Sequence, residues 1–186
     1  MVRTSLFLLV LLSACGSGVS STAGAQKAYL GLDPSVDRAI ALGLAGFNAA
    51  SSANIAPQMA AGAVSGALMV SGQVDQGASA NRGMRLDESL SNYSDDGRVT
   101  YSTDPAALPA LTIDLKSIPG GTLDGSLVGS FLMSGGLTGQ VSLTLSFSGR
   151  IEAGTEAGTV VRKVGTTHIT GTATSPAGTY NVDVTR

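Results

Sequence analysis

Apolar and polar residues alternate most regularly between residues 138 and 151 (TGQVSLTLSFSGRI). Side chains of a β-strand point alternately to its two faces, so this pattern predicts a strand with one apolar and one Ser/Thr-rich face. A slip of one residue would exchange the two faces, so the orientation of the strand is strongly specified. Its apolar face carries Val141, Leu143, Leu145, Phe147 and Ile151.

Weaker alternation predicts further strands along the rest of the chain, about eight in all. Short turn-forming pairs such as Asp96-Gly97 and Gly135-Gly136 separate several of them. Such turns connect antiparallel strands, because parallel neighbours need a crossover of roughly a dozen residues. The pattern therefore predicts a mainly β fold built as an antiparallel meander. The remaining strands are expected at 64–75, 84–93, 98–103, 110–116, 122–133, 160–174 and 179–185.

One N-terminal helix is predicted over about residues 34–50, where apolar side chains recur every three or four positions. Asp33 suits its N-cap position and Pro34 its first helical position. An antiparallel sheet with one apolar face must cover that face. We therefore expect a curved sheet or barrel with this helix packed on it, and we favour the curved sheet with the helix across its concave side. The apolar stripe consists of Val36, Ile40, Leu44 and Phe47.

The first fifteen residues are typical of an export signal. Arg3 precedes an uninterrupted apolar run from Leu6 to Leu12. As a helix this run would span only about 10 Å, which is too short to cross a bilayer. A short cationic segment followed by a short apolar segment and small residues is the pattern of a secretory signal peptide. The sequence Leu12-Ser13-Ala14-Cys15 that follows resembles the lipobox of bacterial lipoproteins at all four positions.

This resemblance implies a signal peptide over residues 1–14 and a mature chain that begins at lipidated Cys15. In that family the thiol receives a diacylglycerol and the new amino group is usually acylated, commonly with palmitate. An aspartate in the next position tends to mean inner-membrane retention in Gram-negative lipoproteins, so Gly16 indicates the outer membrane. Residues 15–30 are then expected to be the lipidated cysteine and a flexible tether of small residues, followed by a single helix-plus-meander domain over 31–186.

The composition excludes several other classes of protein. The chain has 11 Lys and Arg against 13 Asp and Glu, a net charge of -2, and its cations form no cluster. Nucleic acid is therefore not an expected partner. One Cys and one His are too few for a zinc site or a disulfide framework. We expect no metal and no cofactor.

The sequence also lacks the motifs of common catalytic sites. It has no G-x-S-x-G, no S-x-x-K and no phosphate-binding loop. His168 is its only imidazole; it lies on the polar face of a predicted strand, within potential reach of Asp183 on the next strand. Asp95-Asp96-Gly97 lacks the spacing of a calcium loop and is explained by turn geometry. We therefore expect no catalytic residues and no enzymatic activity.

Four functions follow from these observations. The first is a non-enzymatic structural or interaction module of the cell envelope, held at the membrane through Cys15, with an envelope protein or polymer as partner. The alternative is a carrier of a lipid or other apolar ligand, since periplasmic lipid-handling lipoproteins pair a curved antiparallel sheet with helical cover. A membrane-spanning β-barrel and an unfamiliar enzyme are further alternatives. The carrier's ligand face would be formed by Leu127, Phe131, Leu143, Leu145 and Phe147.

Overall fold

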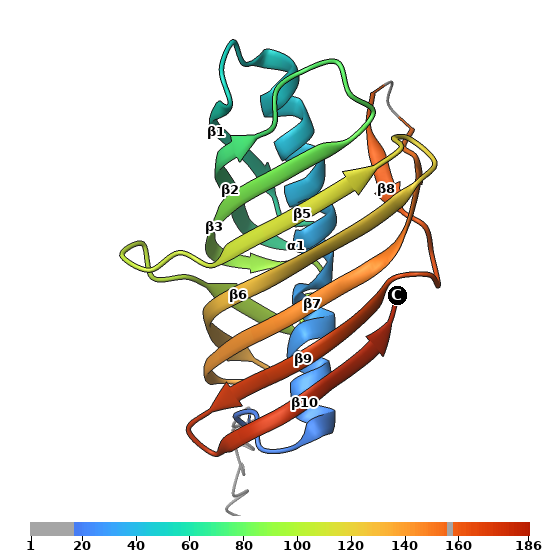
Figure 1. The fold of residues 1–186 in the computed structure, drawn as a ribbon. Coiled ribbons are helices and arrows are strands. Elements are labelled where there is room, and N and C mark those ends of the chain that lie inside the picture. Colours follow the sequence, from blue (N-terminus) through green and yellow to red (C-terminus); the bar gives the residue numbers. More distant parts are fainter. Residues whose placement is uncertain (1–16, 156–157) are drawn as a thin grey trace, which may run out of the picture.

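A computed structural model describes residues 17–155 and 158–186 and confirms the mainly β fold (Figure 1). One helix, α1 (Thr22–Ala49), packs on a curved antiparallel sheet within this part of the chain. None of the helical segments described is both long and apolar enough to cross a membrane. The sheet has ten strands: β1 (Asn54–Ala61), β2 (Ser65–Val74), β3 (Arg82–Ser94), β4 (Val99–Ser102), β5 (Ala110–Lys116), β6 (Thr122–Gly135), β7 (Gly139–Ala153), β8 (Val160–Arg162), β9 (His168–Ser175) and β10 (Gly178–Thr185).

The strands follow the order β1-β2-β3-β4-β6-β7-β9-β10, and every pairing between them is antiparallel. The long strand β3 pairs with β5 along one part and with β4 along another, so both short strands lie between β3 and β6. β8 pairs only with the end of β7. β1 and β10 are the two edges, so the sheet is curved but open.

Two strand predictions differ from the structure. β1 was not predicted, because its sequence (NIAPQMAA) contains a proline and small residues that do not alternate in polarity. Residues 160–174 were predicted as one strand but form β8 and nearly all of β9, separated by a turn in which the Thr166 amide donates to the Lys163 carbonyl at 3.2 Å. These differences explain why the sheet has ten strands rather than about eight.

The helix begins at Thr22, twelve residues before the predicted start, so the assignment of Asp33 as N-cap is wrong. Ser21 is the N-cap, and its hydroxyl accepts a hydrogen bond from the Gly24 amide at 3.1 Å. The additional turns extend the buried face of the helix back through Tyr29, and burying this face stabilises them. The Asp33-Pro34 pair resembles a helix start and so gave no sign that the helix begins earlier. Proline inside a helix removes one backbone hydrogen bond, and Pro34 is tolerated in this packed helix.

The predicted flexible tether over residues 15–30 is therefore wrong from Ser17 onward. Residues 22–30 belong to α1, and Val19 before them is only 1% exposed. Small side chains were interpreted as a sign of flexibility, but here they allow the chain to lie close against the ends of the sheet. Gly16 and Cys15, the predicted site of lipidation, lie outside the described residues, as does the predicted signal peptide.

The helix crosses the inner face of the sheet and contacts both edge strands, β1 and β10 (Figure 1). Two glycines on the side that faces the sheet allow the helix to approach β4 and β3 closely. A Cβ at Gly31 would lie 2.5 Å from the Tyr101 hydroxyl oxygen, and one at Gly43 would lie 2.9 Å from the Met84 sulfur. The gain in packing therefore offsets the low helix propensity of these glycines, about 1 kcal/mol each.

Candidate functional site

The end of the molecule where the described chain begins is fixed by contacts with two β-turns. Ser17 forms a parallel bridge with Leu137 in the β6–β7 turn, and its carbonyl accepts from the Thr138 amide at 3.4 Å. The Ser175 hydroxyl, beside the β9–β10 turn, donates to the Val19 carbonyl at 2.6 Å. We call this surface, formed by residues 17–20, 136–140 and 175–177, the anchor end. It lies at the lower end of the molecule in Figure 1.

A hollow of about 310 Å³ opens at the anchor end. It is lined by residues 17–20, 138–140 and 175–177, all of which are uncharged and, apart from Gln140, small. None of the described residues that line it has an ionisable side chain. The hollow is therefore suited to contact with a neutral surface or an apolar group rather than to acid–base chemistry.

Two cations stand beside the anchor end. Lys27 on α1 and Arg98 after the β3–β4 turn are both exposed and line one shallow hollow together with Asp96. The Lys27 ammonium approaches Gly136 in the β6–β7 turn, at 4.0 Å from where a Cβ would lie. Among the residues that the structure describes, neither cation forms an ion pair within 4.0 Å. This side of the anchor end therefore presents net positive charge.

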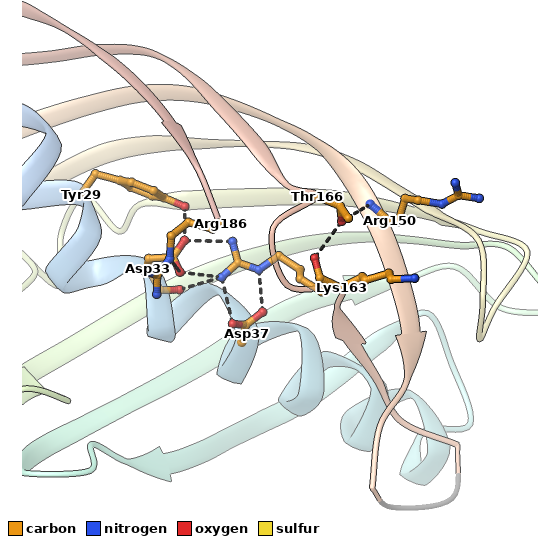
Figure 2. A network of polar contacts seen from close by, with 8 residues as sticks. Tyr29, Asp33, Asp37, Arg150, Lys163, Thr166 and Arg186 are labelled. Atoms are coloured by element: carbon orange, nitrogen blue, oxygen red, sulfur yellow. Dashed lines mark hydrogen bonds and ion pairs between the residues drawn. The ribbon is translucent and has the colours of Figure 1, made fainter.

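A second polar feature, shown in Figure 2, ties α1 to β8 and to the end of the chain. The Arg162 guanidinium donates to both carboxylate oxygens of Asp33, at 2.9 Å each, and to Asp37 at 2.6 and 2.9 Å. The Tyr29 hydroxyl also donates to Asp33, and Arg186 Nε donates to Asp33 at 3.0 Å. The side chains of Arg162 and Asp33 are 6% and 2% exposed. We call these five residues the Arg162 network.

The electrostatics of the Arg162 network favour its ionised form. Burial raises the pKa of Asp33, but the hydrogen bonds and charge of Arg162 outweigh it and hold that pKa below its ordinary value. Burial and the neighbouring Asp33 charge raise the pKa of Tyr29. Two arginines balance two aspartates, and Arg162 already uses Nε and both terminal nitrogens. The network is thus a structural clamp on the helix rather than a site for an added anion.

A similar cluster holds the middle of α1. Arg38 donates to the Tyr93 hydroxyl at 3.0 Å and to Asp95 at 2.9 Å, and the Tyr93 hydroxyl donates to Asp95. The same carboxylate accepts from the Ala63 amide at 2.6 Å. Asp95 is therefore engaged in structure, and residues 17–155 and 158–186 contain no group of three or more acidic, His or Cys side chains arranged to hold a metal.

Glu88 is the one ionisable side chain in the described chain that is fully buried without a hydrogen-bond partner. It lies on the inner face of β3, in phase with Met84, Leu86 and Leu90. Both carboxylate oxygens are unpaired, and burial alone raises the pKa of Glu88 to about 8. Among the described residues, no charged or hydrogen-bonding neighbour contributes to this shift.

His168 and Asp183 do lie side by side, with Nε2 3.7 Å from a carboxylate oxygen. Their side chains are 55% and 69% exposed on the outer face of β9 and β10, and Thr185 is 3.5 Å from the other ring nitrogen. The pair stands on an open strand surface rather than in a cleft, so its geometry shows no means of positioning a substrate.

The residues predicted to line an apolar ligand face lie together on the inner side of β6 and β7. α1 covers this face, and the Tyr29 and Phe147 rings lie 6.2 Å apart between their centroids. The five side chains are part of the packed core, so a ligand would have to displace the helix. Their exposures are Leu127 0%, Phe131 1%, Leu143 1%, Leu145 1% and Phe147 3%.

Comparison with known proteins finds no matching family model, no matching curated protein and no matching solved structure.

Proposed function

We propose that this protein is a lipid-anchored lipoprotein of the bacterial cell envelope, acting as a non-enzymatic structural or interaction module at the outer membrane. The observation that carries the proposal is the lipobox ending in Cys15, the only cysteine of the chain. Ser17, two residues along the chain from Cys15, pairs with Leu137 at the anchor end of the domain. A membrane anchor and a folded module are thus joined almost directly.

The outer face of the sheet supports an interaction role. It presents hydroxyl side chains on neighbouring strands, as in the Ser142, Thr144 and Ser146 row of β7 opposite Thr174, Thr172 and Thr170 of β9. This row of hydroxyl side chains is polar and uncharged, and it can hydrogen-bond to an envelope protein or polymer. We therefore infer that this outer row of hydroxyl side chains binds a partner.

Lipidation can be tested in Gram-negative cells that express the full chain and are fed an alkyne analogue of palmitate. We expect the wild-type protein to carry the label and to fractionate with the outer membrane. The Cys15→Ser variant should lose the label. Adding Ser20→Cys to that variant restores one thiol five residues away and should not restore the label. Equal labelling of all three proteins, or none of the wild type, would disprove the proposal.

The second candidate, an apolar-ligand carrier, is favoured by one observation: a single helix covers the apolar face of an open, curved sheet. Native mass spectrometry on the chain from Gly16, exported behind a different cleavable signal, tests it. The chain must start there because Val19 and Ser21 belong to the fold. A stoichiometric lipid adduct would favour the carrier, whereas an empty protein would favour the interaction module.

A further inference from the structure

The distance between the lipid and the domain is set by two residues. This inference rests on the proposed lipidation of Cys15. Consecutive Cα atoms are 3.8 Å apart, so Ser17 lies within about 8 Å of the lipidated residue. Ser17 is itself held by Leu137 and Thr138, and Val19 by Ser175. The β6–β7 and β9–β10 turns must therefore stay near the membrane surface, whatever conformation the two residues adopt.

The charges on this side of the molecule match a phospholipid surface. Lys27 and Arg98 are exposed beside the anchor end and have no ion-pair partner within 4.0 Å in the part of the chain that the structure describes. Asp96 is the one acidic side chain in the same hollow. Lysine and arginine close to an anionic leaflet are attracted to its phosphates. The anchor end itself carries no charged side chain, so contact with the headgroups removes water from no charged group on this surface.

The opposite end of the molecule is defined by other contacts. The Ile118 amide donates to the Ala80 carbonyl at 2.8 Å, and the Arg82 guanidinium lies 4.2 Å from the centre of the Phe47 ring. The loops at 75–81 and 117–121 therefore gather at the C-terminal end of α1. The 28 residues of this helix make it about 42 Å long.

We propose that the anchor end is a docking surface for anionic phospholipid headgroups, with Lys27 and Arg98 at the phosphates. The domain stands on the membrane on the β6–β7 and β9–β10 turns, and α1 leads away from the bilayer. The loops at 75–81 and 117–121 then point away from the membrane, where a partner can reach them.

Site-specific fluorescence quenching on the full lipidated protein tests this orientation. The lipidated Cys15 has no free thiol, so a single added cysteine takes the label. Ala177→Cys places a fluorophore at the anchor end, and Ala78→Cys is the matched alanine substitution in an exposed loop at the other end. The proteins are placed in vesicles of phosphatidylethanolamine and phosphatidylglycerol that carry a short-range quencher on the headgroup.

We expect the label at position 177 to lose most of its fluorescence and the label at position 78 to keep it. An insertion of ten Gly and Ser residues after Gly16 lengthens the link to roughly 19 Å and should restore much of the fluorescence at position 177. In the lengthened protein, where the link no longer fixes the distance, Lys27→Gln with Arg98→Gln should reduce the remaining quenching further, by removing the attraction to phosphatidylglycerol.

Three results would overturn the orientation: equal quenching at both positions, quenching at position 78 alone, or an insertion that leaves the quenching at position 177 unchanged. Unchanged quenching in the lengthened, charge-neutralised protein would overturn the role of Lys27 and Arg98. The intact mass of the same samples separates this failure from that of the proposed function. A protein that carries the acyl groups but shows equal quenching refutes the orientation alone. A protein without acyl groups refutes the lipid anchor, and the orientation with it.

Discussion

Replacing Glu88 with glutamine should stabilise the domain by an amount that grows as the pH rises. In the folded protein this carboxyl is fully buried on β3, its two oxygens lack partners, and burial raises its pKa to about 8. In the unfolded chain it returns to its ordinary value of 4.5. Between these two pH values the folded state holds a proton that the unfolded state has released, so stability falls as the pH rises.

The size of the effect follows from proton linkage. Each pH unit inside that window lowers the free energy of unfolding by about 1.4 kcal/mol. At pH 7 the buried carboxyl therefore costs the folded state about 3 kcal/mol relative to acidic conditions, and near pH 8 the loss levels off at about 5 kcal/mol. Glutamine has the same shape and no such titration, so this pH-dependent part of the instability should disappear.

Urea unfolding of the lipid-free chain from Gly16, followed by far-ultraviolet circular dichroism at several pH values from 4.5 to 8, measures the difference. Asp87→Asn is the matched control, because this neighbouring side chain is exposed on the opposite face of β3. The stability gap between Glu88→Gln and wild type should widen steadily with pH, while the control follows the wild type. A gap that does not change with pH would refute the reasoning.

Two further predictions concern the helix. Arg162→Leu leaves the buried carboxylate of Asp33 with one ion-pair partner among the described residues, Arg186. Removing one partner of a buried pair costs about 3–5 kcal/mol, which urea unfolding would measure as a loss of stability. An unchanged midpoint would show that the Arg162 network does not hold α1. Ser21→Ala removes the N-cap and should lower stability by about 1 kcal/mol, whereas Ser20→Ala should not; equal effects of the two would refute the cap.

The sequence predicted the strands whose side chains alternate clearly and missed the one that does not. The run from 138 to 151 forms β7, and its apolar side chains lie in the core as the alternation predicts. β1 has no such alternation, because it is an edge strand and most of its side chains are exposed. Its place in the sheet depends on pairing with β2, a contact that local sequence cannot show.

The polar sites were partly visible in the sequence. Glu88 lies midway between Leu86 and Leu90, so the two-residue alternation of the strand places it on the same buried face. Tyr29, Asp33 and Asp37 are spaced four residues apart and share one side of a helix. That signal was hidden by the assignment of a helix start at Asp33. Their partner Arg162 lies far along the chain, and only the folded sheet brings it to the helix.

The measurement that tests the central claim most directly is the mass of the N-terminal peptide of the full-length protein isolated from bacterial membranes. The lipid-anchor account predicts a peptide that begins at Cys15 and carries a diacylglyceryl group on its sulfur with an acyl group on its amino terminus. A peptide with an unmodified Cys15 thiol, or a mature chain that begins after Cys15, would contradict it.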